Sequence, residues 1–306
     1  MTKVPAPLTA FESRVVMTCV PAGSRITGAA YFRHHSYPCP IRVTVRVPGG
    51  AMRSVVVRSV RHPQGHIERE VGLYPVLARL GLPVPHLLAG PRADRSTSPR
   101  RPRIVVSLLP GINLQQMGER GGAHRARAAR LVVTAVRRLH ALTSAIRRDP
   151  VERIIPRGGL ASHLNTILRK EGPWQGEPSF RDAARRLRPA LERIRTPLVF
   201  SNGDYQPANF LALGGRLSGF LDFEFAWFED PLYGFAKYPI YDIAPLNRAG
   251  VVKRYLRAAG FTDRDFAPRL ALGCLATLSR EVGVTGGNER YRRHILRLLE
   301  ASLGRL

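Results

Sequence analysis

Residues 201–209 read SNGDYQPAN and follow the short apolar run LVF at residues 198–200. Asp204 and Asn209 are five positions apart, and Asp222 comes thirteen positions later, within the segment GFLDFEFAWFEDP. The apolar runs on either side of a Gly-Gly pair predict a strand, a polar loop and then a hairpin of two strands. Because the two strands of a hairpin pair with each other, this one brings Asp222 back beside Asn209.

The residue types in this hairpin fit phosphoryl transfer, which needs few protein groups. One carboxylate orients the attacking hydroxyl and accepts its proton, while carboxylate and amide oxygens hold Mg²⁺. Asp204, Asn209 and Asp222 supply these groups. The alternative is that they are ordinary polar loop residues, as each would be if it stood alone.

The composition bounds the class of protein. The chain has 306 residues, 44% of them hydrophobic, which is enough for one large domain or two lobes. No run approaches the roughly 20 apolar residues of a membrane helix, and Glu12 and Arg14 before the short VVMTCV run argue against a signal peptide. The three cysteines are too scattered for a disulfide framework or a metal site. We therefore expect a cytoplasmic protein without a membrane segment, and the sequence leaves its oligomeric state open.

The chain is strongly basic, with a net charge of +26, and all but four of its 48 basic residues are arginines. Such a skew reflects either the base composition of the coding genome or a positive field that attracts polyanions. The densest arginine segments are residues 98–103, 124–130 and 290–297. Aromatic residues do not interleave them as a stacking platform for nucleic acid requires. We interpret these segments as solvated surface, and nucleic-acid binding through them remains an alternative hypothesis.

The apolar patterns divide the chain into two regions. Strands are predicted at residues 28–34, 41–47, 53–60, 86–90 and 103–109, with one helix at 66–80. Pro75 inside that helix predicts a kink or a restart, because proline removes a backbone donor. Later segments with helical periodicity are residues 129–142, 163–170, 180–195 and 289–303. We therefore predict an α+β chain with an antiparallel-sheet N-lobe, residues 1–110, and a mostly helical C-lobe, residues 111–306.

The combination NGDYQPANFL, GFLDFE and DP resembles the catalytic region of the aminoglycoside phosphotransferases and their choline-kinase-like relatives. The resemblance extends from about residue 40 to residue 240 and implies a bilobal protein-kinase-like fold. It implies that Asp204 is the catalytic base and that Asn209 and Asp222 hold Mg²⁺, with Glu224 as a third candidate ligand.

The N-lobe carries weaker elements of the same resemblance. The strand SVVVRSV places Arg58 where the family has the cation that contacts the nucleotide phosphates. The segment EREVGLYPVLARLGLPVP resembles the helix whose glutamate pairs with that cation, which makes Glu70 the candidate. In RIVVSLLPGINL, the backbone from Ser107 to Leu109 would contact adenine.

Three departures from the family pattern bear on activity. Asn202 stands where the family usually has histidine, Arg58 replaces the usual lysine, and Gly234 replaces a common aspartate. Asparagine can still hydrogen-bond within the loop, and arginine keeps the charge with a different shape. The loop expected over the phosphates, residues 34–40, has no glycine.

The resemblance implies an ATP-dependent phosphotransferase that uses Mg²⁺ and transfers the γ-phosphate to a hydroxyl of a small molecule. The alternative is a catalytically degenerate relative that binds nucleotide, for which the three departures argue. A polycationic acceptor would need an acidic pocket, to which Glu229, Asp230 and Asp242 could contribute. The positive field of the whole chain opposes such an acceptor, so we expect a neutral or anionic one.

Several other residues have a structural explanation. His140 lies on an apolar helix face and is predicted to be a core histidine with satisfied hydrogen bonds. Asp230, before Pro231, is expected to shape a turn. The aromatic residues between 223 and 235 are expected to lie mostly in the core, with some available to line a substrate pocket.

Overall fold

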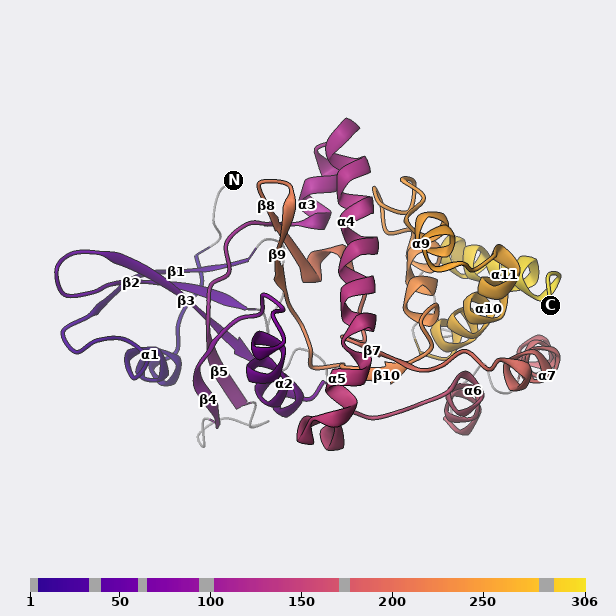
Figure 1. Ribbon diagram of the computed structural model, residues 1–306, viewed down its shortest axis with the longest axis horizontal. Helices are drawn as coiled ribbons and strands as arrows, with labels where there is room; N and C mark the ends of the chain where they lie inside the picture. Colours follow the sequence, from indigo (N-terminus) through magenta and orange to yellow (C-terminus); the bar gives the residue numbers. More distant parts are fainter. Residues whose placement is uncertain (1–4, 33–39, 60–64, 94–101, 171–176, 281–288) are drawn as a thin grey trace.

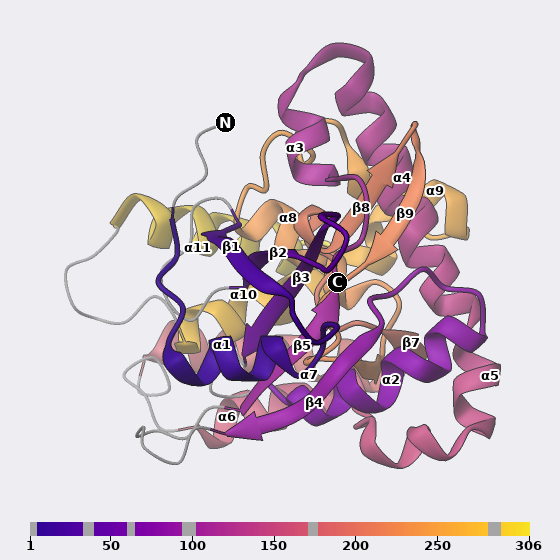
Figure 2. The ribbon, with the colours of Figure 1, turned by 90° about the vertical axis from the view of Figure 1, so that its left-hand side faces the viewer.

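The computed structural model describes residues 5–32, 40–59, 65–93, 102–170, 177–280 and 289–306. Its N-terminal part is a five-stranded antiparallel sheet with the strand order β1-β2-β3-β5-β4 (Figure 1). Figure 2 views this sheet in front of the C-terminal helices. The elements are α1 (Ala10–Met17), β1 (Arg25–Tyr31), β2 (Ile41–Arg46), β3 (Met52–Ser59), α2 (Ile67–Arg79), β4 (Leu87–Ala93) and β5 (Pro102–Ser107).

The C-terminal part is mostly helical and is crossed by the long central helix α4 (Figure 1). Two small sheets adjoin α4. The sheet β6-β8-β9 lies between α4 and the N-terminal part, and the sheet β10-β7 lies at the lower end of α4 in the view of Figure 1. The first elements are β6 (Ile112–Asn113), α3 (Leu114–Glu119), α4 (Gly122–Ala141), α5 (Thr143–Arg148), η1 (Pro150–Ile154), α6 (Leu160–Arg169) and α7 (Pro178–Arg193). The later ones are β7 (Val199–Ser201), η3 (Pro207–Asn209), β8 (Phe210–Leu213), β9 (Arg216–Phe220), β10 (Trp227–Glu229), η4 (Tyr233–Ala236), α8 (Lys237–Ile240), α9 (Val251–Ala259), α10 (Asp263–Arg280) and α11 (Glu289–Leu303).

The two faces of the five-stranded sheet belong to different hydrophobic clusters. Successive side chains on a strand point to opposite faces, and in β3 Val55 and Val57 pack with α1, whereas Val56 packs with α2. The cluster on the α2 side continues without a break into the C-terminal helices. One continuous core therefore joins the sheet to the helical part.

The predicted strands and helices are largely confirmed, and the differences concern helix bounds and helices that were not predicted. Helix α2 runs from Ile67 to Arg79 without a restart, because Pro75 is exposed and only one backbone donor is lost. Helices α1, α3, α5, α8, α9 and α10 were not predicted individually. The signal for α1 is the capping box of Thr9 and Glu12, in which each residue accepts a hydrogen bond from the backbone N–H of the other.

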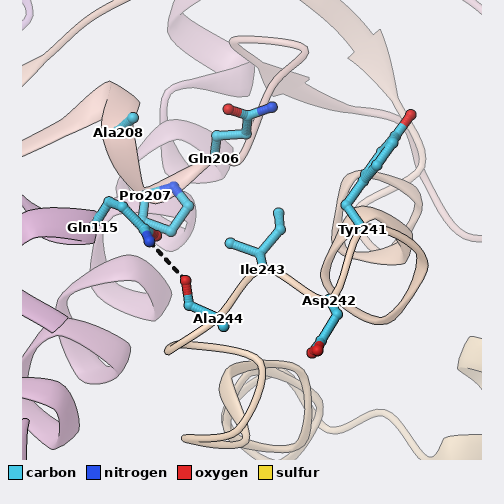
Figure 3. A pocket seen from close by; sticks show the side chains of 8 residues that line it. All are labelled: Gln115, Gln206, Pro207, Ala208, Tyr241, Asp242, Ile243 and Ala244. Carbon is cyan, nitrogen blue, oxygen red and sulfur yellow. Dashed lines mark hydrogen bonds between the residues drawn. The ribbon is translucent and has the colours of Figure 1, made fainter. Parts of the chain in front are cut away.

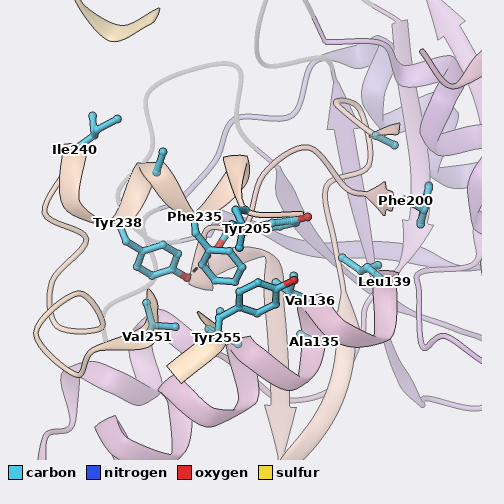
Figure 4. Packing of buried hydrophobic residues seen from close by; sticks show 14 of the residues in the cluster. Ala135, Val136, Leu139, Phe200, Tyr205, Phe235, Tyr238, Ile240, Val251 and Tyr255 are labelled. Carbon is cyan, nitrogen blue, oxygen red and sulfur yellow. Dashed lines mark hydrogen bonds between the residues drawn. The ribbon is translucent and has the colours of Figure 1, made fainter. Parts of the chain in front are cut away.

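Helix α4 forms the centre of the C-terminal core. Its buried face, which includes Ala135, Val136 and Leu139, packs close to the aromatic residues Phe235 and Tyr255 (Figure 4). The helix begins at Gly122, seven residues before the predicted start at residue 129. The prediction missed these first turns because they are rich in arginine and lack apolar periodicity. Within the described residues, no helix is both long and apolar enough to cross a membrane.

The prediction for His140, on α4, is confirmed. Its Nε2 lies 2.8 Å from the hydroxyl of Tyr205, and its Nδ1 lies 3.0 Å from the hydroxyl of Tyr255. Burial lowers the pKa of His140 to about 3. The imidazole is therefore neutral and serves as a hydrogen-bonded part of the core.

The turn after β10 is held by a buried ion pair. Asp230 accepts a hydrogen bond from the backbone N–H of Leu232 at 2.9 Å, which confirms its expected role in shaping the turn. Its carboxylate also receives Nε and Nη2 of Arg269, on α10, at 3.1 and 2.7 Å. Both side chains are almost fully buried, so water cannot solvate either charge if its partner is removed.

We predict that Asp230→Ala lowers the free energy of unfolding by about 3–5 kcal/mol, because it leaves the guanidinium of Arg269 buried without a counter-charge. Urea denaturation measures this change. Arg79→Ala is the control, since Arg79 pairs with Asp149 but its side chain is 64% exposed, and its expected cost is below about 1 kcal/mol. Equal losses in the two variants would contradict the prediction.

Candidate active site

The predicted hairpin is formed by β8 and β9. The backbone N–H of Leu221 donates to the carbonyl of Asn209 at 2.9 Å, which places Asp222 beside Asn209 as expected. Gly214 and Gly215 make the turn with φ of 58° and 79°. Asp222 itself has φ of 63°, a left-handed conformation that is uncommon for aspartate and is often found at functional sites.

The loop that carries Asp204 is organised around the backbone of that residue. The side-chain nitrogens of Asn202 and Asn209 donate to the carbonyl of Asp204 at 2.9 and 3.1 Å. The side-chain oxygen of Asn202 accepts the N–H of Asp204 at 3.3 Å. Asn202 therefore organises the loop, and Asn209 retains its amide oxygen for a ligand.

Gly203 allows this loop to lie against the segment after β9. Its φ is 75°, and a Cβ atom at this position would lie 2.0 Å from the carbonyl oxygen of Phe225. Any other residue would push the two segments apart. The loop and the end of the hairpin are thus packed backbone to backbone.

Arg58 lies on β3, two positions after Val56, and so faces α2. Its Nε is 2.9 Å from Oε2 of Glu70, and its Nη2 is 2.6 Å from Oδ1 of Asp222. The carboxylate of Glu224 lies further away, at 3.8 Å. Burial opposes the charge on Arg58, but these carboxylates outweigh it and hold its pKa above the ordinary value.

Glu70 is fully buried, accepts two hydrogen bonds and forms one ion pair. Its Oε1 receives the hydroxyl of Tyr74 at 2.7 Å and the N–H of Phe223 at 2.9 Å, while Oε2 pairs with Arg58. Burial raises the pKa of Glu70, and the charge of Arg58 counters that effect. The expected pairing of Arg58 with Glu70 is present, and it extends to Asp222.

The remaining predicted residues are placed as follows. Glu224 is buried beside Arg58, and its backbone carbonyl accepts the N–H of His66 at 3.1 Å. Ser107 exchanges two hydrogen bonds of 2.9 Å with His86, one through its N–H and one through its hydroxyl. Leu109 follows β5 and lies close to Gly219 of β9. The predicted phosphate-covering loop lies almost entirely outside the described residues.

The donor set at the hairpin fits Mg²⁺. Within the described part of the chain, no group of three histidine, cysteine or acidic residues forms a protein cage for a metal. Mg²⁺ does not need such a cage, because it usually keeps several waters and takes one or two carboxylates plus phosphate oxygens. The carboxylate of Asp222 and the amide oxygen of Asn209 are oxygen groups of this kind.

The model of the phosphotransferase enzyme family matches residues 42–270. The chain belongs to this family. Among curated proteins, no sequence matches it significantly.

Solved structures show the same fold. A thermostable mutant of aminoglycoside phosphotransferase APH(4)-Ia, in complex with AMP-PNP and hygromycin B, has a TM-score of 0.70 and 14% identity, covering 97% of this chain and 99% of that chain. The GDP complex of aminoglycoside 2'-phosphotransferase-IIIa has a TM-score of 0.64 and 17% identity, covering 96% and 98%. The predicted bilobal protein-kinase-like fold is therefore confirmed.

Gly234, where the phosphotransferase family commonly has aspartate, makes room for Tyr205. A Cβ atom at Gly234 would lie 2.6 Å from two ring carbons of Tyr205. The ring is buried, and its hydroxyl meets His140. In this member of the family, the aromatic ring of Tyr205 occupies space that a side chain at residue 234 would need.

Two titratable residues lie near Asp204, and one of them, Lys237, was not assigned a role from the sequence. Lys237, at the start of α8, places Nζ 2.8 Å from Oδ1 of Asp204. Glu229 is buried, and burial raises its pKa to about 7, opposed by a hydrogen bond from Ser201 and by the charge of Lys237. The available signal for Lys237 was that it is one of only four lysines in this arginine-rich chain.

A cavity of about 410 Å³ opens next to the loop that carries Asp204, residues 202–209 (Figure 3). This loop is called the catalytic loop below, after the role proposed for Asp204. The cavity is lined by residues 206–208 of that loop, by residues 241–244 and by Gln115, whose Nε2 donates to the carbonyl of Ala244 at 2.6 Å. Asp242 is the acidic residue in this lining, and its carboxylate accepts a hydrogen bond from Asn247. Glu229 and Asp230, the other two acids suggested for an acidic pocket, are buried and do not line this cavity.

We predict that Arg58→Met destabilises the protein by about 3–5 kcal/mol, because Glu70 is left buried without its counter-charge. The double variant Arg58→Met, Glu70→Gln should recover part of this loss, since glutamine carries no charge. Urea denaturation of both variants measures the difference. A double variant that is less stable than Arg58→Met alone would contradict this explanation.

Glu229 is predicted to make stability fall as pH rises. Between its unfolded pKa and its folded pKa of about 7, the native state binds a proton that the unfolded state lacks, so the free energy of unfolding decreases with pH. The contribution is on the order of 3 kcal/mol. Glu229→Gln should therefore gain stability over the wild type progressively from pH 5 to pH 8, as measured by denaturation. Glu300→Gln, an exposed change on α11, controls for the loss of one negative charge.

Proposed function

We propose that the protein is an ATP-dependent phosphotransferase that transfers the γ-phosphate to a hydroxyl group of a small molecule. The observation that carries this proposal is the convergence of four side chains from distant segments. Arg58 contacts Asp222, and Asn209 contacts the backbone of Asp204. A carboxylate, two oxygen donors of the kind that Mg²⁺ takes and a guanidinium lie close together in a kinase-like fold, which supports these roles.

Each side chain has a role in the transfer. Asp204 accepts a hydrogen bond from the acceptor hydroxyl and takes its proton as the oxygen attacks. A bond forms between that oxygen and the γ-phosphorus, the bond from the γ-phosphorus to the bridging oxygen breaks, and ADP leaves. The guanidinium of Arg58 has five N–H donors, so it can contact phosphate oxygens while it keeps Glu70 as a partner.

Asn209 and Asp222 would hold Mg²⁺, with Glu224 as the third candidate ligand. When bound, the ion neutralises phosphate charge and orients the groups that react. The backbone between Ser107 and Leu109 remains the proposed contact for the base of the nucleotide. Solved relatives include complexes with GDP and with AMP-PNP, so both ATP and GTP are candidate phosphate donors.

The cavity beside residues 206–208 is the proposed acceptor site. Gln206 follows Asp204 by two residues, and its N–H donates to Oδ1 of Asp204 at 3.3 Å, so the cavity begins at the base. Its lining combines two glutamine amides, a tyrosine and aliphatic side chains, with Asp242 as its acid. Such a lining suits a neutral polyhydroxyl compound better than the polycations kanamycin and hygromycin B found in solved relatives.

The proposal predicts that Mg-ATP stabilises the wild type and that Asp222→Ala loses this effect. At a concentration one hundred times the Kd, a ligand adds about 2.7 kcal/mol to the stability of the folded state. Thermal-shift measurements with Mg-ATP and with Mg-GTP test this expectation. Asp182→Ala, on α7 and away from the site, is the control and should retain the shift.

Catalysis is tested by ADP formation with a panel of neutral, anionic and cationic hydroxyl compounds. Asp204→Ala should lower the rate by about 10²–10⁴-fold, because the proton acceptor is lost. Binding of Mg-ATP without turnover of any acceptor would favour the alternative, a degenerate nucleotide-binding relative. Equal rates in the wild type and Asp204→Ala would remove Asp204 from the mechanism.

A further inference from the structure

Lys237 contacts the carboxylate that we propose as the catalytic base. Its Nζ lies 2.8 Å from Oδ1 of Asp204, and 33% of its side chain is exposed, against 15% for Asp204. The two residues are 33 positions apart in sequence. The pair therefore exists only because the segment after η4 folds back onto the catalytic loop.

The backbone around Lys237 is fixed to the catalytic loop on both sides. Before it, Gly234 packs against the ring of Tyr205. After it, the hydroxyl of the buried Tyr238 donates to the carbonyl of Tyr205 at 2.8 Å (Figure 4). The ammonium thus comes from a segment that is anchored to the same loop as its partner.

The contact uses one oxygen of the carboxylate. Oδ1 of Asp204 accepts from Nζ of Lys237 at 2.8 Å and from the N–H of Gln206 at 3.3 Å. Two donors on the same oxygen fix the rotation of the carboxylate. The second oxygen, Oδ2, remains to accept the hydrogen bond of an acceptor hydroxyl.

Lys237 also lies next to the proposed acceptor site. The N–H of Tyr241 donates to the carbonyl of Lys237 at 2.9 Å, so the two residues are one helical turn apart and share a face. Tyr241 lines the cavity. The buried carboxyl group of Glu229 also interacts electrostatically with Lys237.

We propose that Lys237 is a positioning residue, which holds Oδ1 of Asp204 so that Oδ2 faces the acceptor hydroxyl. This inference rests on the proposed phosphotransferase function. A carboxylate that rotates freely would reach the productive geometry less often, and small misplacements of reacting groups can cost up to about 10²-fold in rate. Lys237 acts through Asp204 and contributes little to nucleotide binding, which occurs at Arg58, Asn209 and Asp222.

The test compares kcat and the KM for ATP in the full-length protein, with the best acceptor from the panel or with water as acceptor. Lys237→Met should lower kcat by about 10- to 100-fold while the KM for ATP changes by less than about twofold. Lys237→Arg should recover most of kcat, because a guanidinium also donates to a carboxylate. Lys253→Met, an exposed lysine on α9, controls for the lost charge.

Tyr238→Phe separates positioning from simple anchoring. It removes the neighbouring hydrogen bond between the same two segments without touching the carboxylate of Asp204. If Lys237 only fastens α8 to the loop, Tyr238→Phe should lower kcat as much as Lys237→Met, with a similar fall in Tm. That result would overturn the inference, as would an unchanged kcat in Lys237→Met or a loss confined to the KM for ATP.

Failure of the proposed function has a different signature. If the wild type forms no more ADP than Asp204→Asn with any acceptor, both the phosphotransferase proposal and this inference fall. If the wild type turns over and Lys237→Met turns over equally well, only the role of Lys237 falls. Thermal shifts with Mg-AMP-PNP, expected to be the same in the wild type and Lys237→Met, verify that each variant is folded and binds nucleotide.

Discussion

The buried ion pair of Arg58 with Glu70 and Asp222 is the interaction on which the rest of the structure depends. It joins β3, α2 and the segment after β9, three elements far apart in sequence, at distances of 2.9 and 2.6 Å. Removing these charges from water is costly, so the arrangement depends on the close opposite charges and on the hydrogen bonds that Glu70 accepts. The hydroxyl of Tyr74 and the backbone N–H of Phe223 donate hydrogen bonds to the carboxylate of Glu70. The charges that would meet a nucleotide are therefore also the charges that hold the two parts of the chain together.

The loop that carries Asp204 depends on a second constraint, which is close packing around Tyr205. The ring needs the empty space at Gly234, its hydroxyl meets His140, and its carbonyl accepts the hydroxyl of Tyr238. Gly203 meets the backbone of Phe225 from the other side of the loop. Departures from the family pattern at residues 202 and 234 are thus compensated, because asparagine hydrogen-bonds to the loop backbone and glycine admits the tyrosine ring. They do not by themselves indicate a degenerate site.

The site concentrates negative charge within a very basic chain. Only 22 residues of 306 are acidic, yet Glu70, Asp204, Asp222, Glu224 and Glu229 lie around the hairpin and the catalytic loop. Arg58 and Lys237 balance part of this charge, and burial changes the ionisation of Glu229. The cavity next to the loop is, by contrast, mostly amide and aliphatic. The arginine excess therefore does not reach the described lining of this cavity.

The sequence by itself determined the hairpin, most of the strands, the helices α2, α4, α6, α7 and α11, and the position of Asp222 beside Asn209. These follow from local periodicity and from a turn whose two strands are neighbours in the chain. The likeness to a known family supplied Arg58 and Glu70, which no local pattern connects. Only the tertiary structure decided that Lys237 meets Asp204, that Gly234 admits Tyr205, and that Glu229 and Asp230 are buried away from the cavity. Those contacts join residues tens of positions apart, and they depend on how the segments pack in three dimensions, which periodicity and residue type do not encode.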